Sequence, residues 1–274
     1  MRPQSPDRLQ DPRSASQRRT ERPIEHRGEQ QSWAASLGET PVRFEYWQYG
    51  HGPLFVNVHA SEGESVAAAR ADVERYEGSL LAIKNGDHRN LEFRFQGATF
   101  RVDPNRIFTP EGARKTLTRL NRSFRHLRPI EQAEVIAEVT RFSNKILQQF
   151  HVDEQSAVIA LHNNTDGGGL SIRSYRDGGS EAGNVSDHHE SEDHDRDDFF
   201  CVNQQDDFDH LKGLGYNVAL YDKRRQEDDG SLIVACSNRN VRYYNVEAQP
   251  SHGGTQGNMI HSICERLKRL NERT

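Results

Sequence analysis

The stretch "LFVNVHASEGESV", residues 54–66, indicates how this chain folds. The run "LFVNV" predicts a buried strand, and "ESVAAARADVERY", after a short turn, predicts a helix. Ser61 and Glu64 form the S-x-x-E pattern of a capping box, so we expect the helix to begin at Glu62 with Ser61 as its N-cap. His59 would then end the strand and Glu62 would open the helix, facing the crevice where open α/β sheets bind ligands.

Strand-like and helix-like runs alternate along the rest of the chain. Strands are predicted at "SAVIAL", "YNVALYD", "SLIVACS" and "VRYYNVE", and a hairpin is predicted at "LEFRFQGATFRVD" with Gln96-Gly97 near its turn. The segment "EQAEVIAEVTRFSNKILQQF" predicts a long amphipathic helix, and a closing helix carries Met259, Ile260, Ile263, Leu267 and Leu270. This order predicts an α/β fold with one central, mixed sheet.

Two polar segments border or interrupt this pattern. Residues 1–35 are rich in Arg, Gln and Pro and nearly lack aliphatic side chains, so we expect a disordered arm. Residues 176–198 contain nine acids and two arginines, a net charge of −7, and we expect a flexible acidic surface insertion. Its histidines (His188, His189 and His194) are more typical of a solvated loop than of a metal site. Residues 36–274 are expected to form one domain.

Composition limits the classes of partner. The 274-residue chain has a formal net charge of −5, which argues against nucleic acid, whose phosphates require a basic surface. Its three cysteines, Cys201, Cys236 and Cys264, suggest neither a disulfide framework nor a thiolate zinc site. No run is long and apolar enough to span a membrane, and no signal-peptide core is visible, so the default expectation is a soluble, cytoplasmic protein. The sequence defines no oligomeric state.

The pair His59 and Glu62 is a weak metal motif alone, but a third candidate ligand strengthens it. In "AVIALHNNTDGGG" another apolar strand ends in a histidine, His162. Two histidines that each end a buried strand, with a glutamate beside one of them, form a ligand set that leaves the fourth position of zinc open for water. The sequence therefore predicts a zinc site at His59, Glu62 and His162, although such a set also suits other divalent metals.

Two further segments offer groups that a hydrolase needs. Glu247 lies near the end of the strand "VRYYNVE", where its carboxylate could act as the base that takes a proton from metal-activated water. In "RVDPNRIFTPEG", Asn105 and Arg106 stand side by side and could bind a carboxylate. The structural alternatives are a surface glutamate on an edge strand and a turn that closes the preceding strand.

The order of these motifs resembles that of the zinc metallocarboxypeptidase superfamily. The H-x-x-E pair, a D-x-N-R stretch, a strand ending in His and a strand ending in Glu follow one another over about residues 53–265. The likeness is greatest to the succinylglutamate desuccinylase and aspartoacylase branch, where a D-L-N-R-x-F stretch is typical and "DPNRIF" matches it here. The chain departs from that branch in having "HASE" instead of H-G-N-E, and Pro104 instead of the usual aliphatic residue.

The resemblance implies a three-layer sandwich and a set of roles. Zinc would be bound by His59, Glu62 and His162, and Glu247 would be the general base and later the proton donor. The family also uses an arginine to stabilise the oxyanion. Arg89 is our choice for that role, and Arg94 and Arg101 remain open.

The function implied is zinc-dependent hydrolysis of a peptide or amide bond next to a free carboxylate, of the carboxypeptidase type. Deacylation of N-acyl amino acids, as by aspartoacylases and desuccinylases, is an alternative, and so is an inactive, carboxypeptidase-like binding protein. The expected partner is a peptide or N-acyl amino acid substrate; neither nucleic acid nor a membrane is expected.

Overall fold

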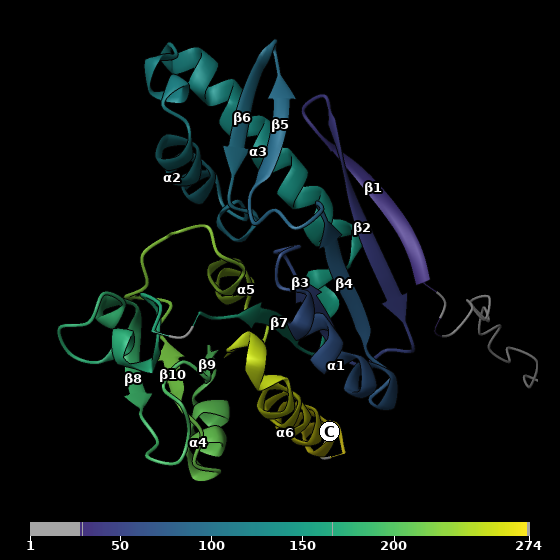
Figure 1. Ribbon diagram of the computed structural model, residues 1–274, viewed down its shortest axis with the longest axis vertical. Helices are drawn as coiled ribbons and strands as arrows, with labels where there is room; N and C mark the ends of the chain where they lie inside the picture. Colours follow the sequence, from purple (N-terminus) through teal and green to yellow (C-terminus); the bar gives the residue numbers. More distant parts are fainter. Residues whose placement is uncertain (1–27, 29, 166, 273–274) are drawn as a thin grey trace, which may run out of the picture.

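A computed structural model describes residues 28, 30–165 and 167–272 (Figure 1). Nine strands form one sheet in the order β1-β2-β4-β3-β7-β11-β9-β10-β8. These strands are β1 Gln30–Leu37, β2 Thr40–Gln48, β3 Leu54–Asn57, β4 Ser79–Lys84, β7 Val158–Asn163, β8 Val185–His189, β9 Phe199–Val202, β10 Val218–Tyr221 and β11 Tyr243–Ala248. The pairs β3–β4, β3–β7, β7–β11 and β9–β10 are parallel, and the other pairs are antiparallel, so the sheet is mixed as predicted.

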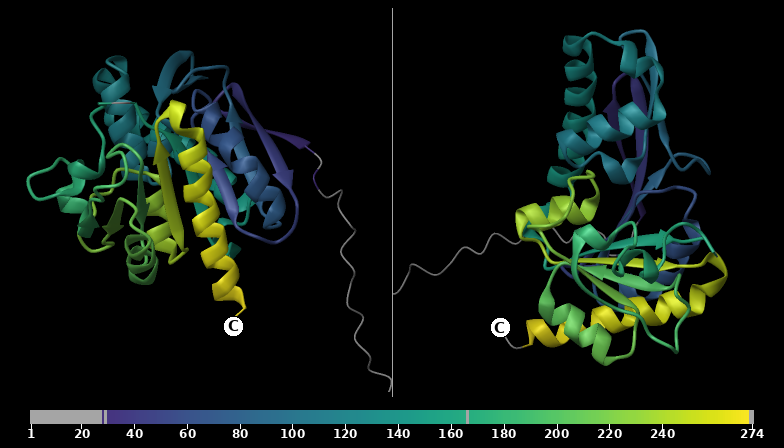
Figure 2. Two further views of the ribbon diagram at one scale, coloured as in Figure 1. Left: turned by 60° about the horizontal axis from the view of Figure 1, so that its bottom comes forward. Right: turned by 90° about the vertical axis from the view of Figure 1, so that its left-hand side faces the viewer.

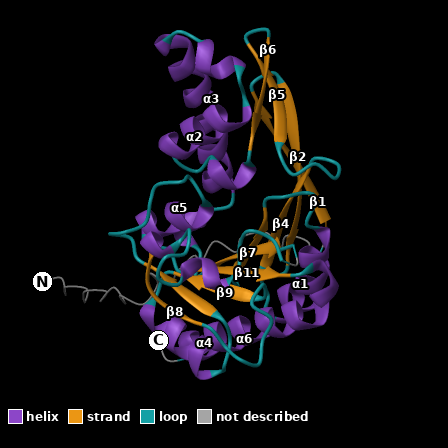
Figure 3. Ribbon diagram, turned by 60° about the vertical axis from the view of Figure 1, so that its left-hand side comes forward, coloured by secondary structure: helices purple, strands orange, loops and turns teal. Residues whose placement is uncertain are grey.

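Helices cover both faces of this sheet, which gives the expected three layers (Figure 3). The helices are α1 Gly63–Arg75, α2 Pro110–Leu120, α3 Pro129–Gln149, α4 Gln205–Gly213, α5 Leu232–Arg239 and α6 Gly253–Asn271. Apolar side chains of α1, α4 and α6 form one core cluster against the sheet, and those of α2, α3 and α5 belong to a second. Buried apolar area of this kind supplies most of the driving force for folding. The α/β, three-layer prediction is therefore confirmed.

The strands β5 Leu91–Phe95 and β6 Ala98–Val102 form the predicted hairpin as a separate two-stranded sheet. Gln96 and Gly97 at its turn both have positive φ, at 49° and 77°, as a tight hairpin turn requires. The hairpin stands with α2, α3 and parts of β1 and β2 at one end of the molecule (Figure 2). It leads directly into the short 3₁₀ helix Pro104–Arg106, which carries two of the predicted site residues.

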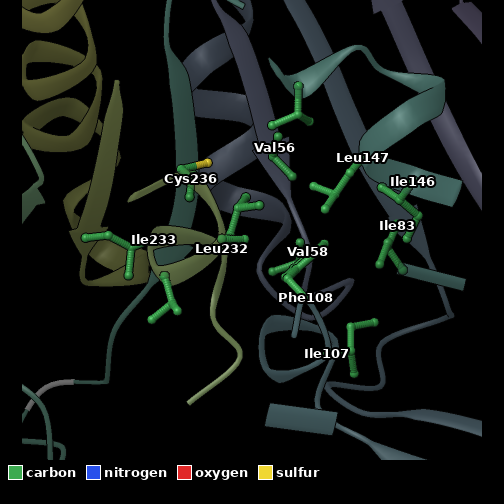
Figure 4. Close-up of a cluster of buried hydrophobic side chains, with 14 of the residues drawn as sticks. Val56, Val58, Ile83, Ile107, Phe108, Ile146, Leu147, Leu232, Ile233 and Cys236 are labelled. Carbon is green, nitrogen blue, oxygen red and sulfur yellow. The ribbon is translucent and has the colours of Figure 1, made fainter. Parts of the chain in front are cut away.

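One predicted strand is wrong. The run "SLIVACS" forms the helix α5, whose residues 232–237 are all buried. A short apolar run fits a fully buried helix as well as a buried strand, and here Asn240, in the left-handed conformation at φ 57°, ends the helix. Leu232, Ile233 and Cys236 lie in the same core cluster as Val58 and Phe108 (Figure 4).

The two polar segments are also more ordered than expected where the structure describes them. Residues 30–35, assigned to the arm, lie in β1 and pair with β2; residues 1–27 and 29 lie outside the described residues. Within 176–198, the strand β8 pairs with β10 at the edge of the main sheet, so this segment is part of the fold and not a simple loop insertion. Charged side chains on such a strand are a common way to protect a sheet edge. Within the described part of the chain, no helix combines the length and apolarity needed to cross a bilayer.

A buried carboxylate ties α4 to α6 and to the start of β11. Asp207 has no exposed surface, and it accepts hydrogen bonds from Arg242 and from Nε of Arg266, the latter at 2.6 Å. Removal of one partner from such a buried charge network leaves the remaining charges uncompensated.

We expect Asp207→Asn to lower the free energy of unfolding by about 3 kcal/mol, as is typical when a buried charge loses its partner. Urea denaturation followed by circular dichroism would measure the change. Asp206→Asn is the matched control, because the Asp206 side chain contacts the same two arginines but is 52% exposed. We expect it to cost less than about 1 kcal/mol. Equal losses in the two variants would contradict the burial argument.

Candidate metal centre

The three predicted ligands converge at the carboxyl ends of two adjacent parallel strands. His59 follows β3 by two residues, Glu62 is the N-cap residue of α1, and His162 is the penultimate residue of β7. All three are buried, and one ligand atom from each lies within 4.8 Å of the other two. His59 and His162 are 103 positions apart in sequence, and they lie in one compact cluster because β3 and β7 are paired.

The turn between β3 and α1 is held by side-chain amides. Nδ2 of Asn57 donates to the backbone oxygen of Glu62 at 3.3 Å and to that of Leu161 at 3.4 Å. The predicted capping box is wrong: Ser61 is not the N-cap, and the backbone N–H of Ser65 is instead bound by Oδ1 of Asn163 at 3.0 Å. Because Asn163 of β7 caps this N–H group, the Glu62 side chain does not serve as the cap and faces the histidines instead.

The Glu62 carboxylate bridges the two imidazoles. Its Oε2 lies 2.9 Å from Nδ1 of His162, and its Oε1 lies 3.0 Å from Nδ1 of His59. Burial would raise the pKa of Glu62, but the contacts with His162 and His59 outweigh burial and hold this pKa well below its usual range. Glu62 is therefore ionised at neutral pH.

A second carboxylate, Asp103, orients His59 from the other side. Its Oδ1 lies 2.9 Å from Nε2 of His59, in the arrangement by which a carboxylate fixes the tautomer of a metal-binding histidine. Burial lowers the pKa of His59, but the hydrogen bond to Asp103 and the contacts with Glu62 raise it above its ordinary value. The negative charges that favour a proton on His59 would also favour a divalent cation.

One buried atom of the cluster has no hydrogen-bond partner among the described residues. Nδ1 of His59 is fully buried, and although Glu62 Oε1 is 3.0 Å away, the pair lacks hydrogen-bond geometry. If Nε2 of His59 donates to Asp103, Nδ1 offers a lone pair toward the centre of the cluster. Two imidazoles and a carboxylate are the donors that zinc prefers, so the residues present fit such an ion.

Glu247 lies beside this cluster, near the end of its strand as the sequence predicted. In the parallel pair β7–β11, Glu247 is directly opposite His162. β11 lies between β7 and β9, so Glu247 is not on an edge strand, and the residue is only 8% exposed. Burial raises the pKa of its carboxyl group, and Nδ2 of Asn245 donates to Oε1 at 3.0 Å.

The three candidate arginines lie in different places. Nη1 of Arg89 donates to Oε1 of Glu62 at 2.7 Å. Arg101 instead pairs with Glu92 along the hairpin at 2.8 Å, and Arg94 lies 3.9 Å from Glu39. Of the three, only Arg89 contacts a member of the cluster, and its side chain is about half exposed.

Asn105 and Arg106 follow the hairpin in the 3₁₀ helix Pro104–Arg106, which Asp103 caps through the backbone N–H of Asn105. Nδ2 of Asn105 lies 3.5 Å from Nε2 of His162, and its Oδ1 accepts a hydrogen bond from the backbone N–H of Leu232 at 3.0 Å. The turn expected in this stretch is present and brings the Asn105 side chain to the cluster, while the Arg106 side chain lies beside Asp229.

The sequence did not reveal the residues that support the cluster. Asp103 was interpreted only as part of a turn, and Asn163 was not singled out. Gln256 of α6 was also missed; its Nε2 donates to the backbone oxygen of His162 at 2.7 Å. The only available signal was that Asp103 begins the D-x-N-R stretch and that Asn163 follows a candidate ligand. Within the described residues, the histidines of 176–198 do not join a metal-type cluster.

No protein-family model matches the chain, and no curated protein matches it in sequence. Three solved structures are similar to it at 13% identity. They are a succinylglutamate desuccinylase/aspartoacylase from Rhodobacter sphaeroides (92% of this chain, 68% of that chain, TM-score 0.41), an aspartoacylase family protein from Mesorhizobium loti (86%, 68%, 0.37) and a candidate metallopeptidase from Shewanella baltica (86%, 84%, 0.36). These structures carry the family names that the motif order suggested.

Proposed function

We propose that the chain is a zinc-dependent hydrolase that cleaves an amide bond next to a free carboxylate. The observation that carries this proposal is the buried cluster of His59, Glu62 and His162, with ligand atoms within 4.8 Å of one another and Glu247 in register with His162. A metal-binding set and a buried carboxylate at the same strand ends are the groups that metal-assisted hydrolysis requires.

Each side chain then has a distinct task. Zinc held by the cluster would lower the pKa of water and polarise the scissile carbonyl group. Glu247 would accept the proton of the attacking water and deliver it to the leaving amine, a task that suits a carboxyl group whose pKa burial raises. Arg89 would donate to the carbonyl oxygen as negative charge develops on it.

The substrate carboxylate would be bound by Arg106, with the Asn105 amide beside it. Arginine binds carboxylates through paired N–H groups, which also fixes the orientation of the amide bond. We favour a peptide with a free C-terminus, so that the reaction is of the carboxypeptidase type. An N-acyl amino acid presents the same carboxylate next to an amide bond and is the second candidate, through the same residues.

The test is metal-dependent hydrolysis of matched compounds. The protein, incubated with zinc and then freed of excess metal, would be assayed by mass spectrometry on N-blocked dipeptides and N-acyl amino acids, each with a free or an amidated carboxyl end. We expect cleavage of the free acids only, loss of cleavage after chelation, and its return when zinc is added. Cleavage of both forms, or cleavage that survives complete metal removal, would contradict the proposal.

A further inference from the structure

Arg106, to which we assign the substrate carboxylate, already lies beside a carboxylate of this chain. Oδ2 of Asp229 is 3.4 Å from Nε of Arg106, and about a third of each side chain is exposed, 37% for Asp229 and 36% for Arg106. Nη1 of Arg106 donates to the backbone oxygen of Asn105 at 2.8 Å, which fixes the orientation of the guanidinium. A carboxylate that binds Arg106 from solvent must therefore approach Asp229 as well.

The position of Asp229 is set by a tightly packed loop. Its Oδ1 accepts a hydrogen bond from the backbone N–H of Ser231 at 2.9 Å. The neighbouring Gly230 has φ +74°, and a Cβ there would lie 2.5 Å from Cα of Gly112 and 2.7 Å from the backbone oxygen of Arg106. Only glycine permits this close approach, so the backbone holds Asp229 beside Arg106.

Several acidic side chains act on this guanidinium. Burial lowers the pKa of Arg106, but Asp229, Asp103 and Glu181 together raise it above its ordinary value. Asp103 is also near Arg89 and Arg119, at 3.8 and 3.5 Å, which offsets its charge. Among the described residues, Asp229 has an ion pair with Arg106 alone, so a further positive charge would be favoured beside Asp229.

This inference rests on the proposed function and deepens it. We propose that Asp229 is a specificity-determining residue that selects substrates whose carboxyl-terminal residue has a cationic side chain. When the substrate carboxylate pairs with Arg106, it weakens the ion pair between Arg106 and Asp229. A positively charged side chain on the same substrate residue would then pair with Asp229 in place of Arg106. An acidic side chain would instead meet Asp229 with a like charge, so specificity arises from both attraction and repulsion.

Binding of small ligands tests this without relying on turnover. N-acetylarginine and N-acetylcitrulline share their shape and carboxylate, but only the first carries a positive side chain; N-acetylglutamate adds a negative one. Calorimetry on the zinc-incubated protein should give tighter binding of N-acetylarginine than of N-acetylcitrulline by about 5-fold, as expected for one partly exposed ion pair, with N-acetylglutamate weakest. In Asp229→Asn we expect the first two ligands to bind within about 2-fold of each other.

Glu227→Gln is the matched control. It removes the same charge from the same loop, but its carboxylate is 72% exposed and pairs with Lys115, so the preference should remain. Equal binding of the three ligands by the wild type, no binding of any of them, or a preference that persists in Asp229→Asn would overturn the assignment. Selective binding of N-acetylarginine without hydrolysis of any amide would overturn the proposed function instead and leave this assignment intact.

Discussion

Replacing either His59 or His162 with alanine should remove the metal ion from the protein. We expect the wild type, purified without chelator and incubated with zinc, to hold about one zinc per chain, as a single His/Glu/His site implies. Each variant lacks one of three protein ligands, so its affinity should fall by more than the roughly 10- to 100-fold that loss of a supporting residue causes. Elemental analysis after gel filtration would measure the stoichiometry.

A matched histidine makes this result specific. His151 is two-thirds exposed and pairs with Glu154 away from the cluster, so His151→Ala should keep its full metal content. Circular dichroism would establish that each variant is folded, since His59→Ala removes one imidazole partner from each of two buried carboxylates, Glu62 and Asp103. Glu62→Gln, which keeps the shape of the ligand, should also lose zinc. Wild-type protein that holds no zinc after incubation would refute the metal centre.

The electrostatics of the cluster explain why a metal ion is expected there and not only ion pairs. Glu62 and Asp103 both have pKa values held well below their usual range, so two buried negative charges flank His59. Ionised carboxylates buried without compensation are costly, and here imidazoles and arginines lie beside both of them. The atom that these contacts leave without a hydrogen bond, within the described structure, is Nδ1 of His59. A divalent cation between the ligands would bind this nitrogen together with the Glu62 carboxylate.

Much of the site could be predicted because it depends on local sequence. Apolar runs that end in a polar residue indicate strands whose carboxyl ends carry function, and this pattern located His59, His162 and Glu247. In the folded chain, β3 pairs with β7 and β7 pairs with β11, and these pairings bring the three residues together.

The remaining features depend on contacts between distant segments. Asp103 and His59 are 44 positions apart in sequence. The contact between the Asp103 carboxylate and the His59 imidazole can be recognised only when the position of the hairpin against the sheet is known. The run 232–237 was assigned to the wrong element because burial on all sides removes the periodicity that separates helix from strand. The strand β8 was missed because its polar side chains are tolerated at an edge, where pairing with β10 through the backbone is enough.

Glu247→Gln should abolish most turnover and leave the metal in place. The amide has nearly the shape of the carboxylate but cannot accept a proton, and loss of a general base typically lowers the rate by about 10²- to 10⁴-fold. Because burial raises the pKa of Glu247, the variant also removes a costly buried charge and should fold at least as stably as the wild type. Rates on the free-acid substrates, together with zinc content, would be measured on the same preparations.

The pH dependence separates this role from a structural one. A base must be ionised, so wild-type activity should fall as the pH drops through the raised pKa of Glu247, at a pH above that at which an exposed glutamate titrates. The residual activity of Glu247→Gln should lack this decline. Glu154→Gln, an exposed control far from the cluster, should match the wild type in rate and pH profile. Unchanged turnover in Glu247→Gln, or loss of zinc together with activity, would mean that Glu247 is not the base.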